Sequence, residues 1–204
     1  GTANAPQSTS SERRIERWAD FLGRVHVVGV TEAATEAARE FGAREASHVP
    51  HGIDTDVYRP DAGKPGDERD RPVILFVGRL ERRKGVDQLL EIAADWTEPE
   101  VIFRFVGDGP LADDVTAAAR SDRVEYAGYV SDDERLASLY ATSDAFALPS
   151  YVVPGWEELF GIVVIEAMAC GLPVVATDCV GPREIVDDET GFVVPQHDPD
   201  ALAE

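Results

Sequence analysis

Runs of consecutive apolar residues alternate with longer mixed segments along most of the chain. After Pro72, runs such as PVILFVG, VIFRFVG and AFALP carry apolar residues at neighbouring positions rather than at every second one. That pattern is typical of strands covered on both faces. The segments between them, such as GVDQLLEIAADW and DDERLASLYAT, have helical character. The regular order of strands and helices predicts an α/β fold with a doubly wound, Rossmann-like parallel sheet.

The same pattern predicts the residues at which each strand and helix begins and ends. After Pro72, strands are expected at 72–78, 101–107, 124–128, 145–149, 173–177 and 191–195. Helices are expected at 85–96, 110–120, 132–142, 156–171 and 182–188, and another starts at Pro199 behind Asp198. Upstream, helices at 15–23 and 31–42 flank a strand at 25–30. The stretch 49–71, dense in Gly, Pro and Asp, is interpreted as a linker between residues 1–48 and a domain at 72–204.

Charge and composition exclude some classes of function. The chain has 39 Asp and Glu against 19 Lys and Arg, a formal net charge of −20, so binding of nucleic acid is not expected. The acidic residues form either an ordinary solvated surface or, as we favour, the surface of a halophilic protein whose repulsion is screened by salt. The chain has no long apolar run, signal peptide or initiator Met, and we interpret it as a fragment of a longer cytoplasmic protein, truncated at both ends.

The turn GRLERRKG follows the first strand of the main domain and is unusually basic. Arg79, Arg82, Arg83 and Lys84 fall within six consecutive positions, and Lys84 is expected to open the next helix. Helix N-termini attract anions, and added cations oppose the helix dipole unless an anion is bound. We therefore favour a phosphate clamp over a solvated basic turn.

A second strand-end loop, VGDGP, has two glycines in three positions. Gly107 and Gly109 would let a ligand approach the backbone, and Pro110 suits a first helical turn. The loop lacks the third glycine of a dinucleotide fingerprint, so an oxidoreductase is a weak alternative. A plain tight turn explains the loop equally well.

The stretch WEELFGIVVIEAMACG places one glutamate before a helix and another inside it. Glu158 would lie in the loop, and Glu166 about a turn and a half into the helix, so that the carboxylates bracket roughly 8–12 Å. That span fits a sugar at one end of a diphosphate and a ribose at the other, with the amides of residues 160–163 facing the phosphates. In the alternative, Glu158 caps the helix and Glu166 is a solvated helix residue, although its neighbours are apolar.

Two further patterns are interpreted as structural. Asp54 and Asp56 have the spacing of a metal-binding pair but lie in a Gly-rich turn, where Asp is a common turn residue, so no metal is expected. Cys170 and Cys179 lie in or beside apolar segments without CxxC spacing, and buried free thiols are expected.

Five segments together resemble a known family. VGRLERRKGVDQLL, FVGDGPL, GYV, ALPS and EELFGIVVIEAMACGLPVVATDCVGPREIV are similar to the donor-binding half of the retaining glycosyltransferases of family 4, which have the GT-B fold. The resemblance covers about residues 48–200 and includes the E-x7-E signature of that family. Upstream, VHVVGVTEAATEAAREFG is similar to the end of the family's first domain, so residues 1–48 are interpreted as the remnant of an acceptor domain.

The resemblance implies a role for each matching residue. Arg79 and Lys84 would contact the donor diphosphate, and Glu158 the donor sugar. The nucleoside side would be formed by Gly107, Asp108, Gly109, Tyr129, Val130 and Glu166. The backbone amides on the phosphates would be those of Phe160, Gly161, Ile162 and Val163. Because Glu158 would touch only the sugar, the substitution Glu158→Gln is expected to leave binding of the bare nucleoside diphosphate nearly unchanged.

The implied activity is transfer of a sugar from a UDP- or GDP-linked donor, with retention of configuration and without a cofactor or metal. The acceptor, whether a glycan, a lipid or a small molecule, belongs to the missing half, as does any peripheral association with a membrane. The isolated fragment is expected to bind donor but to transfer no sugar. The alternative is a nucleotide-sugar binding module with no transferase activity. One departure from the family, the longer connection at 151–157, borders the donor sugar and leaves its identity open.

Overall fold

The computed structural model describes residues 10–62, 71–97 and 99–204, and the chain divides into two compact units, Gly1–His51 and Gly52–Glu204. In the first unit the helices are α1 (Ser10–Leu22) and α2 (Glu32–Glu40), and the strands are β1 (His26–Gly29) and β2 (Glu45–His48). β1 and β2 pair in parallel, and the Thr31 hydroxyl caps α2 by accepting a hydrogen bond from the amide of Ala34 at 3.1 Å. β2 was not expected because its sequence, EASH, is short and polar.

The second unit is built on a parallel sheet. Its strands are β3 (Val73–Val77), β4 (Ile102–Val106), β5 (Val124–Gly128), β6 (Ala145–Leu148), β7 (Val174–Thr177) and β8 (Gly191–Val194). In the described residues these six strands form one sheet in the order β5-β4-β3-β6-β7-β8. The chain therefore builds outward from β3 on one side, then returns beside β3 and builds outward on the other. This arrangement confirms the predicted doubly wound α/β fold, and its switch point lies between β3 and β6.

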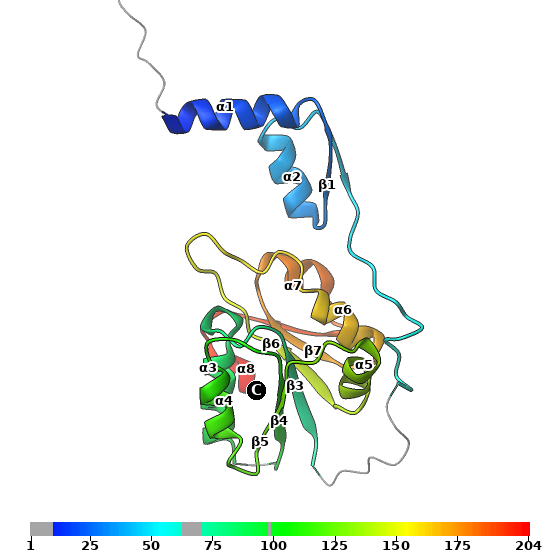
Figure 1. Ribbon diagram of the computed structural model, residues 1–204, viewed down its shortest axis with the longest axis vertical. Coiled ribbons are helices and arrows are strands. Elements are labelled where there is room, and N and C mark those ends of the chain that lie inside the picture. The colour runs from blue at the N-terminus through cyan, green and yellow to red at the C-terminus, as the bar shows by residue number, and fades with distance from the viewer. Residues whose placement is uncertain (1–9, 63–70, 98) are drawn as a thin grey trace, which may run out of the picture. The chain divides into compact units, whose positions relative to one another are not determined.

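Helices cover both faces of this sheet (Figure 1). α3 and α4 lie on one face, and α5 and α6 on the other. The helices are α3 (Val86–Asp95), α4 (Ala112–Ala118), α5 (Asp133–Ala141), α6 (Ile162–Ala169), α7 (Val180–Ile185) and α8 (Pro199–Ala203), and a 3-10 turn, η1 (Arg82–Lys84), precedes α3. Most side chains of β3, β4, β6 and β7 are buried between these layers, as the uninterrupted apolar runs predicted, whereas the edge strands β5 and β8 are more exposed and Phe192 of β8 is 71% exposed.

The core is continuous and rich in aromatic contacts. Phe76 of β3 and Phe105 of β4 lie 5.9 Å apart between ring centroids, and Tyr140 of α5 lies 5.7 Å from Phe146 of β6. Arg104 of β4 is a charged residue within this core: it is 2% exposed, and its Nε donates to a carboxylate oxygen of Glu125 on β5 at 2.9 Å.

The first part of the expected linker packs on this core. Tyr58 is buried, and its ring lies 6.1 Å from that of Tyr140, so the second unit begins at Gly52 rather than at β3. The carboxylate of Asp54 accepts a hydrogen bond from the amide of Asp56 at 2.9 Å, which confirms the interpretation of this pair as a turn. Residues 63–70 of the linker, and residues 1–9 of the expected domain remnant, lie outside the described residues.

Several helix limits differ from those expected, and α1 already begins at Ser10, five residues before the expected start. α6 begins only at Ile162, because Gly161 before it has a φ of 80° and residues 156–161 form a loop. α7 begins at Val180, two residues earlier than expected. Lys84 does not open α3: it ends η1, and Gly85, with a φ of 74°, separates the two. No helix among the described residues is both long enough and apolar enough to cross a membrane.

Candidate functional site

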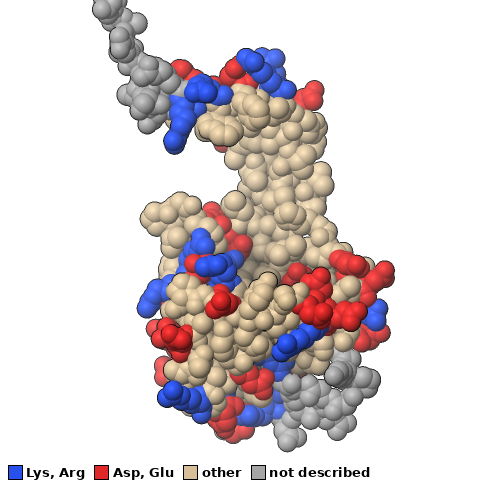
Figure 2. All heavy atoms as spheres, viewed as in Figure 1, with Lys and Arg blue, Asp and Glu red and all other residues tan. Residues whose placement is uncertain are grey.

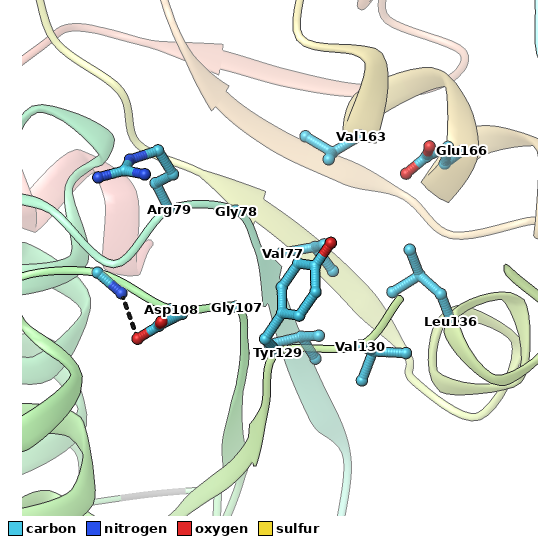
Figure 3. Close-up of a pocket in the computed structure, with 12 residues that line it drawn as sticks. Val77, Gly78, Arg79, Gly107, Asp108, Tyr129, Val130, Leu136, Val163 and Glu166 are labelled. Atoms are coloured by element: carbon cyan, nitrogen blue, oxygen red, sulfur yellow. Dashed lines mark hydrogen bonds between the residues drawn. The ribbon is translucent and has the colours of Figure 1, made fainter. Parts of the chain in front are cut away.

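A cavity of about 570 Å³ opens at the carboxyl ends of β3, β4 and β5. The side chains of Arg79 and Asp108 lie at one side of it, and those of Val163 and Glu166 on α6 lie at the other (Figure 3). The lining residues are Val77, Gly78, Arg79, Val106, Gly107, Asp108, Gly109, Tyr129, Val130, Leu136, Val163 and Glu166. In open α/β sheets ligands bind at this edge and beside the switch point, so the fold itself places the candidate site here.

The glycines of the loop after β4 are required by the protein's own backbone. Gly107 has a φ of 142°, and a Cβ there would lie 1.8 Å from the carbonyl oxygen of Gly78. A Cβ on Gly109 would lie 2.6 Å from the carbonyl oxygen of Leu80. The interpretation that these glycines admit a ligand is therefore incomplete: they first let the loops after β3 and β4 pack together, and the packed loops line the cavity.

Glu166 is a buried carboxylate at the far wall of the cavity. It is 9% exposed, and its Oε2 accepts a hydrogen bond from the hydroxyl of Tyr140 at 2.8 Å. Burial raises the pKa of Glu166 above its usual value, the bond from Tyr140 opposes this rise, and the charge of Asp133 adds to it. The alternative of a solvated helix residue is wrong, and a buried acceptor aimed at a cavity suits a hydroxyl-bearing ligand.

Lys84 and Glu158 form an ion pair outside the cavity lining. Lys84 Nζ donates to Glu158 Oε2, which also accepts a bond from the Ser150 hydroxyl at 3.3 Å. Gly161 occupies the N-cap position of α6 without a side-chain cap, so the alternative of Glu158 as the cap of that helix is wrong. The residue before it, Glu157, instead accepts a bond from the amide of Val180 at the start of α7, at 2.9 Å.

The loop 151–157 is attached to the basic turn. The amide of Tyr151 donates to the carbonyl oxygen of Arg83 at 2.9 Å, and the amide of Val152 donates to Gln196 at 2.7 Å. Val153 and Trp156 exchange backbone bonds at 3.0 and 2.9 Å and close the loop. Arg83 lies over the Trp156 ring at 4.3 Å from its centroid, and Lys84 Nζ lies at 5.2 Å. The indole thus provides a cation–π platform beside the ion pair.

The basic turn is partly neutralised within itself. Glu81 accepts bonds from Arg83 at 2.7 Å and from Arg79 at 3.2 Å. The bond from Arg83 and the charges of both arginines hold the pKa of Glu81 below its usual value, although partial burial opposes this. Figure 2 shows a group of basic side chains with acidic ones directly beside it on the visible face of this unit. Arg79, 67% exposed and lining the cavity, is accessible to an anion despite this pair.

The structure brings most of the candidate residues together. Those that line the cavity are Arg79, Gly107, Asp108, Gly109, Tyr129, Val130, Val163 and Glu166. Those outside its lining are Lys84, Glu158, Phe160, Gly161 and Ile162. Phe160 is buried, and its backbone packs against Gly181, where a Cβ would come within 2.4 Å.

Sequence reasoning missed several residues of the site. Gly78 and Val106 begin the two loops GRLERRKG and VGDGP but were given no role, and Val77 directly precedes the first, so their place at the strand ends could have identified all three. Leu136 and Tyr140 lie on α5, where nothing in the local pattern distinguishes them from ordinary core residues. Cys170 and Cys179 are buried free thiols, as predicted. Among the residues that the structure describes, no group of three or more His, Cys, Asp or Glu could hold a metal ion.

Comparison with known proteins identifies the family. A sequence profile described as "Glycosyl transferases group 1" matches residues 71–204. The GDP-mannose-dependent alpha-(1-6)-phosphatidylinositol monomannoside mannosyltransferase of Mycolicibacterium smegmatis is 32% identical over 218 residues, which cover 99% of this chain and 56% of the relative. The D-inositol 3-phosphate glycosyltransferase 2 of Catenulispora acidiphila is 35% identical over 196 residues, covering 85% of this chain and 44% of the relative. The chain thus spans about half the length of these relatives.

Solved structures agree with the sequence comparison. HepE of Anabaena in complex with UDP superposes with a TM-score of 0.77 at 25% identity, over 98% of this chain and 58% of that chain. Sucrose-phosphate synthase of Thermosynechococcus elongatus superposes with a TM-score of 0.73 at 29% identity, over 97% of this chain and 53% of that chain. These neighbours are glycosyltransferases of the GT-B fold. With the profile match and the sequence relatives, they show that this chain belongs to the group 1 glycosyltransferases.

Proposed function

We propose that this chain is the donor-binding half of a retaining glycosyltransferase that uses a UDP- or GDP-linked sugar. The observation that carries the proposal is the cavity at the sheet's switch point, with a buried carboxylate at one wall and an accessible arginine at the other. Two relatives support the choice of ligand: HepE was solved with UDP, and the mycobacterial mannosyltransferase is GDP-mannose-dependent.

In this proposal the nucleoside lies in the cavity. The walls contributed by Val77, Val106 and Leu136 are apolar and suit a base, and Tyr129 and Val130 approach it from the end of β5. Glu166 accepts hydrogen bonds from the ribose hydroxyls. A carboxylate is the strongest acceptor that the chain could place there, and its low exposure strengthens each bond.

The diphosphate and the sugar extend from the cavity toward the ion pair. Arg79 and Lys84, together with the amides at the start of α6, would stabilise the charge that develops on the departing diphosphate without a metal. Glu158 would orient the sugar and is not assigned as a covalent nucleophile. Catalysis in this proposal depends on positioning and on electrostatic stabilisation, with departure and attack on the same face of the sugar.

Calorimetry on the 204-residue chain tests the proposal. We expect binding of UDP or GDP that survives a chelator and is weakened by Glu166→Gln, and no binding of NADH. Loss of binding in chelator would refute the metal-free site, and binding of NADH alone would favour an oxidoreductase. The chain should bind the nucleotide sugar yet transfer no sugar. In this proposal acceptor recognition, and any contact with a membrane, belong to the other half of the enzyme. If the two halves together transferred no sugar, a nucleotide-sugar binding module would be favoured instead.

A further inference from the structure

Tyr140 is fixed by two aromatic contacts of its ring and by one hydrogen bond from its hydroxyl. The side chain is fully buried on α5, and its ring packs against Tyr58 at 6.1 Å and against Phe146 at 5.7 Å between centroids. These rings come from three separate parts of the fold: the segment before β3, helix α5 and strand β6. The hydroxyl donates to Glu166 Oε2 at 2.8 Å. A tyrosine packed in this way presents its hydroxyl at one fixed point.

Glu166 needs such a partner because its surroundings disfavour a charge. The carboxylate is buried, and the charged and titratable groups facing it are Asp133 and Tyr140 from α5, Tyr58 from the segment before β3, and Cys170 from α6 itself. None of these groups is a cation. Tyr140 is the donor that the structure records for the Glu166 side chain, and a bond to an ionised carboxylate is stronger than one between neutral groups.

We infer that Tyr140 is a positioning residue for ligand binding: by occupying Oε2 of Glu166 it keeps this carboxylate ionised and turns Oε1 toward the cavity, where Oε1 accepts from a ribose hydroxyl. This inference rests on the proposed function. Tyr140 itself does not line the cavity, so it acts on the nucleotide only through Glu166.

The experiment compares four proteins: the native 204-residue chain, Tyr140→Phe, Tyr58→Phe and Glu166→Gln. Tyr58→Phe is the matched control, because it removes a buried tyrosine hydroxyl from the same aromatic cluster without removing the bond to Glu166. Each protein is titrated calorimetrically with UDP or GDP, whichever the native chain binds, and with the 2′-deoxy and 3′-deoxy forms of that nucleotide. The titrations are repeated over a series of pH values that starts below the usual pKa of a glutamate and rises past neutral pH.

Tyr140→Phe is expected to weaken nucleotide binding about tenfold, the loss of one hydrogen bond to a charged group, and to reduce the preference for the hydroxylated ribose. As the pH is lowered, the Tyr140→Phe protein should also lose nucleotide binding at a higher pH than the native chain does, since the Glu166 carboxylate has lost the bond that favours its ionised form. Tyr58→Phe should match the native chain in both respects. Glu166→Gln should lose the preference for the hydroxylated ribose, and its nucleotide binding should no longer weaken at low pH.

The outcomes separate the inference from the proposed function. If the native chain binds neither nucleotide, the proposed function fails. If native and Tyr58→Phe proteins bind and Tyr140→Phe keeps the same ribose preference and pH midpoint, the inference is overturned. A Tyr140→Phe protein that lost only thermal stability would likewise overturn it, because a purely structural tyrosine moves neither readout.

Discussion

Replacing Glu158 with Gln should strengthen the binding of a bare nucleoside diphosphate, rather than leave it nearly unchanged as expected from the sequence alone. In the structure Lys84 is already paired with Glu158, and the two side chains are 17% and 11% exposed, so water and salt screen the pair only weakly. To reach a phosphate, Lys84 must exchange this carboxylate for the ligand. The neutral amide of Gln removes that competition while keeping the shape of the side chain.

The size of the gain follows from the bond that is exchanged. A hydrogen bond to a charged group contributes about 1.5–3 kcal/mol net, which corresponds to roughly 10- to 150-fold in affinity. The Gln oxygen can still accept weakly from Lys84, so we expect the lower end, about tenfold tighter UDP binding. The ligand-free variant should in turn lose about 1–3 kcal/mol of stability, because Lys84 is left without its counter-charge.

Calorimetry with UDP and thermal unfolding with and without UDP measure both effects. The matched control is Glu157→Gln, the same change of charge one position away, where the side chain contacts the start of α7 rather than Lys84. Lys84→Met should weaken UDP binding. If Glu158→Gln left UDP affinity unchanged and Lys84→Met had no effect, the pair would be a structural link and Lys84 would not contact the diphosphate.

Four further predictions address stability. Burial raises the pKa of Glu166, so the folded protein holds this proton more tightly than the unfolded chain and stability falls as the pH rises through the folded pKa. Glu166→Gln should abolish that fall, and at pH values above the folded pKa the variant should have a higher Tm than the native chain; thermal scans at several pH values measure this. Gly107→Ala should cost more than about 3 kcal/mol in urea unfolding, because its Cβ meets a backbone carbonyl, whereas Gly128→Ala, with φ of 70° and open space around it, should cost only about 1–2 kcal/mol. Glu125→Ala should destabilise by about 1–3 kcal/mol because it leaves the buried Arg104 guanidinium unpaired, and Arg104→Met should be close to neutral; equal losses would contradict this explanation. With 39 acidic against 19 basic residues, the Tm should rise from low to molar KCl, and a flat Tm would rule out salt adaptation.

The sheet could be predicted from sequence because its four central strands are buried on both faces and so appear as unbroken apolar runs. The loops that line the cavity were found for a related reason, since a parallel sheet brings the ends of its strands to one edge. The contact between Lys84 and Glu158 could not be found in this way, because 74 positions separate the two residues and each was assigned to a different part of the ligand. Tyr140 gave no local signal, because a buried tyrosine with a hydrogen-bonding partner reads like any other core residue.

The loop 151–157 is fixed at its base, so its tip can change in length without changing the geometry of the site. Tyr151 and Val152 are bonded at its base, and the backbone bonds of Val153 and Trp156 close it. Beyond that closure, Gly155 has open space where a side chain would stand. Gly155 itself has a φ of 81°, which favours glycine, but residues could be exchanged at position 154 or inserted beside it without displacing the turn that holds Lys84. In the proposed function this loop borders the donor sugar, so a library of substitutions at residue 154 and of insertions beside it would test whether the accepted sugar can be changed while the nucleotide site is kept intact.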